Sequence, residues 1–147
     1  MEWKFKSFSE LNSLELYKIL QLRINVFMLE QDCLYPECDN KDLKGHHLFL
    51  SDENLCLAYA RLLPPGVSYP ENSSIGRVVV HPEVRQHKYG KELMKRSIEL
   101  LKLKFPDVPI RISAQEYLKK FYTELGFQIE SDVYLEDDIP HLEMTLY

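Results

Sequence analysis

The chain has 147 residues, of which 45% are hydrophobic and 28% are charged. This length and composition are typical of one globular domain with a sizeable core, and they exclude the disordered and fibrous classes. The net charge of −5, from 18 Lys and Arg against 23 Asp and Glu, argues against a nucleic-acid partner. We expect a single domain over residues 1–147 and no membrane partner, because no apolar run approaches the roughly 20 residues of a membrane span.

The glycine and cysteine counts narrow the class further. Only 5 residues are Gly, and neither G-x-G-x-x-G nor G-x-x-x-x-G-K-[ST] occurs, which excludes the usual dinucleotide fingerprint and the Walker A loop. The 3 Cys do not suggest a disulfide framework, and the first residues lack the apolar run of a secretory signal. We therefore expect a cytoplasmic protein.

The first half of the chain predicts one helix among strands. Residues 3–8 alternate with period two and predict a strand. Asn12 followed by Glu15 is typical of a capping box, and apolar residues at helical spacing continue to Phe27, with Arg23 among them. An irregular acidic segment follows. Two further strands are predicted over residues 47–50 and 56–63.

The second half predicts two more helices. A β-branched run over residues 75–80, stopped by His81 and Pro82, is typical of a buried central strand. The clearest helix is predicted over 90–104, followed by a strand at 110–112. Ser113 and Glu116 suggest the cap of a last helix that ends at Gly126, and two strands near 127–134 and 141–146 complete the chain. The fold class is therefore a mixed α/β (α+β) domain.

Basic residues are concentrated where the buried strand meets the longest helix. From Arg77 to Phe105 there are eight Lys and Arg against three Asp and Glu, which leaves −10 for the rest of the chain. A strand end, a basic turn and a helix N-terminus together favour an anion site. A solvated helix start explains the same charges equally well.

Two segments resemble the GNAT N-acetyltransferases. Val78 to Arg85, with the turn to Gly90, resembles motif A, whose turn reads Gln/Arg-x-x-Gly-x-Gly/Ala; Lys88 stands where the first Gly is usual. Phe121 to Phe127 resembles motif B. Four further pieces resemble the ElaA-like branch of the family: Leu22-Arg23, Val26-Phe27 with Glu30-Gln31, Ala114-Gln115, and Tyr134 to His141.

The resemblance implies a mostly antiparallel twisted sheet, flanked by helices, whose central strands splay apart. It also implies acetyl-CoA as the donor substrate, with its pantetheine arm on the backbone of Val78, Val79 and Val80. The turn after this strand would hold the pyrophosphate, and its residues are Arg85, Gln86, His87, Lys88, Tyr89, Gly90 and Lys91. A Lys at position 88 can avoid the left-handed conformation and add charge to a phosphate site.

Tyr122 matches the family's tyrosine on the motif B helix and would protonate the departing thiolate. A phenol is almost fully protonated at neutral pH and can donate unaided. An amphipathic core residue is the alternative for Tyr122.

The proton acceptor is less defined by the sequence. His81, Glu30, His141 and Glu143 are candidates, and a water relay is another. Arg23, Phe27, Gln31 and His141 match the ElaA-like pattern on the acceptor side, although Arg23 on an apolar helical face also suggests a buried ion pair. The segments 30–42 and 130–143 hold eleven carboxylates and one Lys, which favours a cationic primary amine, small or peptidic, as acceptor.

Other functions remain open at this stage. A CoA-binding or protein-interaction module without catalysis could retain the same fold. Cys33, Cys38, His46 and His47 superficially suggest zinc, but their spacing is irregular and adjacent strand residues face opposite sides, so we predict no metal. Edge strands near the C-terminus would allow a homodimer.

Overall fold

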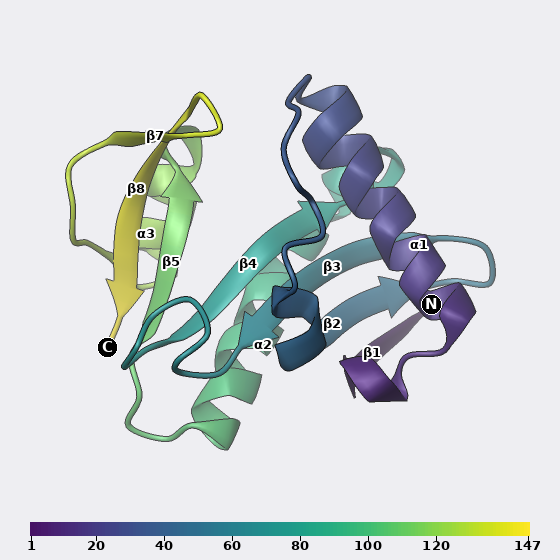
Figure 1. Ribbon diagram of the computed structural model, residues 1–147, viewed down its shortest axis with the longest axis horizontal. Helices are drawn as coiled ribbons and strands as arrows, with labels where there is room; N and C mark the ends of the chain where they lie inside the picture. Colours follow the sequence, from purple (N-terminus) through teal and green to yellow (C-terminus); the bar gives the residue numbers. More distant parts are fainter.

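A computed structural model describes residues 1–147 and contains one sheet with helices on both sides (Figure 1). Its strands follow the order β1-β2-β3-β4-β5-β8-β6, with β7 paired to β8. All neighbouring strands are antiparallel except β4 and β5. The elements are β1 (Glu2–Ser7), α1 (Ser13–Arg23), β2 (His46–Ser51), β3 (Cys56–Leu63), β4 (Ser73–Val80), α2 (Tyr89–Lys104), β5 (Ile110–Gln115), α3 (Lys119–Glu124), β6 (Gln128–Ile129), β7 (Tyr134–Glu136) and β8 (Ile139–Leu146).

The central strands β4 and β5 splay apart, as the family resemblance implies. Their parallel ladder contains only two pairs, Ser73 with Ile110 and Ser74 with Arg111. Beyond these pairs the strands diverge, so that β5, β8 and α3 form a wing beside the β1–β4 part of the sheet (Figure 1). The prediction of a mixed, mostly antiparallel and splayed sheet is confirmed.

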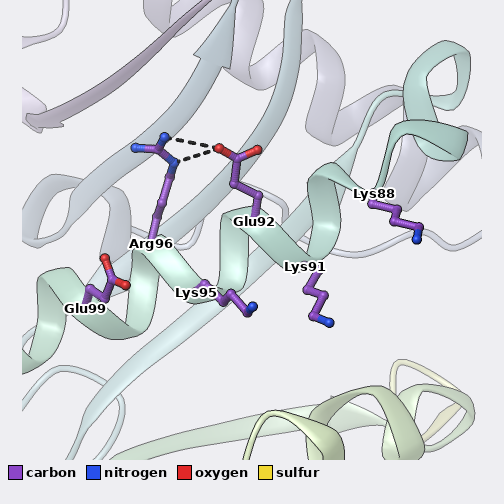
Figure 2. A pocket seen from close by; sticks show the side chains of 6 residues that line it. All are labelled: Lys88, Lys91, Glu92, Lys95, Arg96 and Glu99. Carbon is purple, nitrogen blue, oxygen red and sulfur yellow. Dashed lines mark hydrogen bonds and ion pairs between the residues drawn. The ribbon is translucent and has the colours of Figure 1, made fainter.

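Helix α2 presents two different faces. Its outer face is charged and lines a shallow depression that contains no hydrophobic residue (Figure 2). Its inner face buries Leu93, Met94 and Leu101 in the main core. This amphipathic arrangement follows the apolar spacing in the sequence, and the helix begins one residue before the predicted start.

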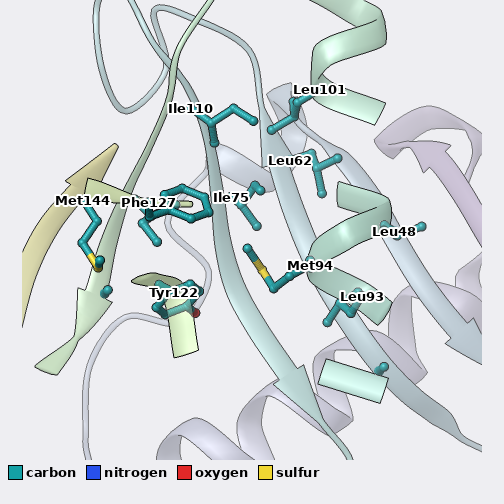
Figure 3. Packing of buried hydrophobic residues seen from close by; sticks show 14 of the residues in the cluster. Leu48, Leu62, Ile75, Leu93, Met94, Leu101, Ile110, Tyr122, Phe127 and Met144 are labelled. Carbon is teal, nitrogen blue, oxygen red and sulfur yellow. The ribbon is translucent and has the colours of Figure 1, made fainter. Parts of the chain in front are cut away.

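Two apolar clusters hold the layers together. The larger one lies between the sheet and helices α2 and α3, and includes Ile75, Ile110, Tyr122 and Phe127 (Figure 3). The smaller one packs Ile19 and other residues of α1 against the opposite face of β2, β3 and β4. Both faces of the central strands are therefore covered, which agrees with the buried β-branched run in the sequence.

Three boundaries differ from the prediction. The first helix stops at Arg23 and continues as a π-helical segment over Ile24–Glu30, which a short apolar repeat does not distinguish from an α-helix. Ser113 does not cap a helix, because β5 continues to pair with β8 as far as Gln115. Between β6 and β7, the Ser131 hydroxyl accepts a hydrogen bond from the backbone of β8 and interrupts the predicted strand over 127–134.

The longest helix, α2, has 16 residues. No helix in the chain combines the length and the apolar character that crossing a bilayer requires.

Candidate active site

A cleft of about 780 Å³ lies where β4 and β5 part. Residues from the π-helical segment, β4, α3 and the β7–β8 hairpin line it. Its volume falls in the range of small-molecule sites in proteins. Of the site residues predicted from the sequence, the cleft contains Tyr122, Glu30, Val78, Val79, Val80, Arg85, Gly90, Phe27, Gln31 and His141.

A β-bulge shapes the β4 side of the cleft. One residue of β3, Ala60, faces two residues of β4, Arg77 and Val78, because the register changes by one between the pairs Arg61–Gly76 and Tyr59–Val79. Arg77 takes a positive φ of 51° at this point. A bulge bends its strand and leaves an extra residue outside the ladder. This places unpaired backbone next to the cleft, on the strand whose backbone, by the family resemblance, would pair with the pantetheine arm.

The turn before α2 is left-handed at Lys88. This residue has φ 60° and ψ 25°, so the expectation that it avoids the left-handed conformation is wrong. The chain must reverse here between a 3₁₀ turn over Pro82–His87 and α2, and the geometry requires a residue in the region that glycine adopts most easily. Lys88 adopts it at a cost of about 1–2 kcal/mol.

The N-terminus of α2 is open to an anion. No side chain caps it. A Cβ added to Gly90 would meet only Val80 Cγ2, at 3.8 Å, so the fold itself does not demand glycine there and the space remains free for a ligand. Free backbone N–H groups at a helix start bind phosphate well. These features fit the pyrophosphate site that the sequence predicted.

Several predicted loop residues do not line the cleft. Gln86, His87, Lys88, Tyr89 and Lys91 do not line it. Figure 2 shows Lys88 and Lys91 instead at one end of the charged depression on α2, beside Lys95. In that depression the only ion pair is between Glu92 and Arg96, so the three lysines keep their charges free near the α2 N-terminus.

Arg85 bridges the two sides of the cleft. Its guanidinium donates two hydrogen bonds to Glu30, at 2.5 and 2.8 Å, and a third to the carbonyl of Val80 at 3.2 Å. The hydrogen bond from Arg85 lowers the pKa of Glu30 below its ordinary range. A carboxylate stabilised in this way is a weak base, which disfavours Glu30 as a proton acceptor.

Tyr122 is buried in the wing and reaches the cleft. Its ring packs edge-on against Phe121 and Phe127, and only 6% of the residue is exposed. Figure 3 shows Tyr122 in the same apolar cluster as Phe127. Burial raises its pKa to about 12, and no hydrogen bond contributes to that shift. The hydroxyl therefore stays protonated at neutral pH and has no partner within the protein, which leaves it available as a donor to a ligand.

Two further predicted site residues, His81 and Arg23, lie outside the cleft. His81 stands at the start of the 3₁₀ turn, where its Nδ1 accepts a hydrogen bond from the backbone N–H of Glu83 at 3.2 Å. Arg23 is completely buried and pairs with Glu37 at 2.5 Å and Asp42 at 2.8 Å. The ion-pair alternative for Arg23 is thus the one that the structure supports, since an unpaired charge there would be costly.

The buried pair belongs to a larger network whose outer members, Asp39, Arg61 and Arg77, line the cleft. Arg61 also contacts Asp42, at 3.1 Å, and Arg77 contacts Glu37 at the same distance. Both arginines also bind Asp39. The ion pairs of Arg61 and Arg77 were not among the sequence predictions. Each arginine lies within an apolar stretch of its strand, and this pattern could have indicated a buried ion pair.

The network accounts for three of the carboxylates in the acidic segment 30–42. Glu37, Asp39 and Asp42 neutralise arginines and are not free to attract an amine. Among the acidic residues that line the cleft, Glu136 and Asp137 of the β7–β8 hairpin form no contact with Arg or Lys. The negative potential that a cationic acceptor would meet therefore comes from the hairpin.

The wall formed by β5 and β8 is polar. Ser113 contacts the hydroxyl of Tyr134 at 2.5 Å and donates to Glu136 at 3.2 Å. His141 lies beside them and is 6% exposed. The sequence indicated His141 as a site residue but not Ser113 or Glu136, because which side chains share a sheet face depends on a register that no local pattern specifies.

The cysteines and histidines that superficially suggest zinc differ in burial or already have hydrogen-bond partners. Cys33 is buried and Cys38 is exposed. Both ring nitrogens of His47 are engaged, one with the Tyr59 hydroxyl at 2.7 Å and the other with the Asp42 carbonyl at 3.0 Å. His47 therefore supports the ion-pair network, because its hydrogen bond to the backbone carbonyl of Asp42 helps to hold that residue in place.

Comparisons with known proteins agree with this geometry. Residues 28–147 match the family described as "Acetyltransferase (GNAT) domain". A UPF0039 protein of Schizosaccharomyces pombe is 45% identical over 99% of this chain and 97% of its own length. Protein ElaA of Escherichia coli is 39% identical over 99% of this chain and 95% of its own length.

Two solved structures share the whole fold. The crystal structure of an acyl-CoA N-acyltransferase from Pseudomonas aeruginosa superposes with a TM-score of 0.94 at 40% identity, and the coverage of both chains is 100%. The crystal structure of Escherichia coli ElaA gives a TM-score of 0.93 at 38% identity, again with full coverage of both chains. The similarity therefore extends over the sheet, the helices and the cleft.

Proposed function

Because this chain belongs to the GNAT acetyltransferase family and is similar over its whole length to ElaA, we propose that it transfers the acetyl group of acetyl-CoA to a primary amine by direct attack. The observation that carries the proposal is the Tyr122 hydroxyl, protonated and without a protein partner in the cleft between β4 and β5. The acceptor is an amine on a small molecule or a peptide.

The chain offers suitable groups for each part of acetyl-CoA. The open N-terminus of α2 and the space at Gly90 suit the pyrophosphate. The backbone of Val78 to Val80, next to the bulge, suits the amide-rich pantetheine arm. Lys88, Lys91 and Lys95 add positive charge close to the same helix end and favour a ligand with several phosphates.

Tyr122 acts on the leaving group in this proposal. Attack of the amine nitrogen on the thioester carbonyl forms the new C–N bond, and collapse of the tetrahedral intermediate breaks the C–S bond. The thiolate then takes a proton from the Tyr122 hydroxyl. A donor in this position contributes about 10²–10⁴-fold to the rate.

Calorimetry and a thiol-release assay test the proposal together. Acetyl-CoA is titrated into the protein, and CoA release is then followed with a panel of primary amines. We expect binding and turnover for the natural sequence, and Tyr122→Phe should lower turnover about 10²–10⁴-fold while leaving acetyl-CoA affinity unchanged. Tyr17→Phe, on the exposed side of α1, is the matched control.

Three outcomes would count against the proposal. Binding of acetyl-CoA without turnover of any amine would indicate a module that retains the fold without catalysis. Failure to bind acetyl-CoA would exclude both functions. Unchanged turnover in Tyr122→Phe would remove this residue from the reaction.

A further inference from the structure

The orientation of His141 is set by its strand. On β8 the neighbouring Leu142 and also Met144 enter the main apolar core on the side of α3. Successive side chains of a strand point to opposite faces, so His141 faces the other side, where it lines the cleft. Its side chain packs against the cleft wall and is hardly exposed to solvent.

The two ring nitrogens of His141 have different partners. Nδ1 lies 2.6 Å from the carbonyl oxygen of Ile139, and a carbonyl can only accept, so Nδ1 carries the hydrogen. In the neutral ring Nε2 then carries the lone pair. The ring stacks on Tyr134, with 6.3 Å between centroids and 23° between planes, which keeps this orientation.

Glu136 stands beside the free nitrogen. Its Oε2 lies 3.4 Å from His141 Nε2, and its other carboxylate oxygen accepts the hydroxyl of Ser113. The Glu136 side chain is 50% exposed, so the carboxylate contacts both the ring and bulk water. When Nε2 gains a proton, Glu136 becomes its ion-pair partner.

We propose that His141 Nε2 is the proton acceptor for the amine, and that Glu136 positions the ring and stabilises its protonated form. This assignment rests on the function proposed above. The ammonium N–H bond breaks as the Nε2–H bond forms, and the neutral nitrogen attacks the thioester. Over one turnover the nitrogen loses two protons and the CoA sulfur gains one from Tyr122. The proton on Nε2 leaves to solvent by way of Glu136, and the second nitrogen proton leaves to solvent as the tetrahedral intermediate collapses to the amide. Tyr122 takes one proton back from solvent, so one turnover releases one proton net.

The other candidate bases are engaged elsewhere. Glu30 forms the two hydrogen bonds from Arg85, and His81 lies outside the cleft. Glu143 accepts hydrogen bonds from Tyr69 at 2.9 Å and Arg111 at 3.0 Å. Of the four groups that the sequence offered, His141 is the one with a free lone pair in the cleft.

The basicity of the amine provides a test that separates proton transfer from a structural role. A simple alkylamine has a pKa near 10 and must lose a proton before attack, whereas an alkoxyamine is already neutral at pH 7. At this pH, His141→Gln should lower kcat/KM about 10²–10⁴-fold for the alkylamine and less than about 10-fold for the alkoxyamine. Glu136→Gln should show a smaller loss with the same preference. His46→Gln, outside the cleft, is the matched control.

A second measurement uses the natural protein, so that misfolding of a variant cannot affect its result. Nitrogen NMR of the His141 ring should show that its neutral form carries the hydrogen on Nδ1, and a neutral form with the hydrogen on Nε2 would overturn the assignment. Equal loss for both amines in His141→Gln, or no loss, would overturn it as well while leaving the proposed function intact. Absence of turnover by the natural protein with every amine would overturn both.

Discussion

Arg85 and Glu30 are 55 residues apart in the chain and join in a two-bond ion pair across the cleft. The pair connects the turn before α2 with the end of the π-helical segment. The cofactor side and the acceptor side of the proposed site are thus linked by one exposed contact. Both side chains are more than 40% exposed, so the pair contributes less than about 1 kcal/mol to folding.

Glu30→Gln should tighten acetyl-CoA binding a few-fold, because it removes a negative charge from the cleft and frees the Arg85 guanidinium. Arg85→Gln should weaken binding, and both effects should shrink as salt rises. Titration calorimetry at low and high ionic strength measures them. Glu53→Gln, at an exposed position between β2 and β3 and outside both the cleft and the charged depression, is the control carboxylate. Equal tightening in that variant would contradict the role of the pair.

Asp42→Asn should destabilise the fold by about 3–5 kcal/mol, because it removes the carboxylate that Arg23 and Arg61 share and leaves one positive charge of the buried network without compensation. Urea denaturation at pH 7 gives the free energy of unfolding, and Glu99→Gln should change it by no more than about 0.5 kcal/mol. A loss below about 1 kcal/mol in Asp42→Asn would show that the network is screened by water.

We also expect the loss of stability in Asp42→Asn to depend on pH. Burial alone would raise the pKa of Asp42, but the hydrogen bonds from Arg23 and Arg61 lower it below the ordinary value. A carboxyl with a lowered pKa stabilises the fold above its unfolded pKa of about 3.9 and loses that contribution as the pH falls through the folded value. The difference in unfolding free energy between the natural protein and Asp42→Asn should therefore shrink below about pH 4.

The three thiols should differ in reactivity. Cys38 is exposed, whereas burial raises the pKa of Cys56 to about 12 and also raises that of Cys33, with help from Asp137. A thiolate is the reactive form, so only Cys38 should react quickly with a disulfide reagent at pH 7.5. Cys38→Ser should remove the fast phase, and Cys56→Ser should not. A second fast thiol in the folded protein would contradict the burial of Cys33 and Cys56.

The sequence predicted the parts of the fold that depend on local patterns. Helix α2, the central strand and the capping box at Asn12 all appear, the last with a 2.8 Å hydrogen bond from the backbone of Glu15. These features are encoded within a few residues, by apolar spacing or by one cap. The family motifs likewise led to Tyr122 and Gly90, both of which line the cleft.

The features that the sequence did not reveal depend on distant contacts. The bulge at Arg77 is defined by pairing with β3, and the contact between His141 and Glu136 requires the β7–β8 hairpin. Arg23 matched the ElaA-like pattern on the acceptor side, and the sequence left a buried ion pair as the alternative without naming its partners. These partners, Glu37 and Asp42, lie 14 and 19 positions away. No local period identifies such partners, because a one-residue change of register alters which side chains meet.

Lys88→Gly should relieve backbone strain, because position 88 has φ 60° and glycine adopts this region freely. The gain of about 1–2 kcal/mol is offset in part by about 0.5–1 kcal/mol from the greater freedom of glycine in the unfolded chain. We therefore expect a net increase of about 1 kcal/mol or less in the free energy of unfolding.

Lys88→Ala is the control variant, because it removes the same charge without relieving the strain and should not stabilise the fold. Lys91→Gly, inside the first turn of α2, should destabilise by about 1 kcal/mol. Urea denaturation of the three variants separates conformation from charge, and equal stability of Lys88→Gly and Lys88→Ala would show that the left-handed turn carries no strain.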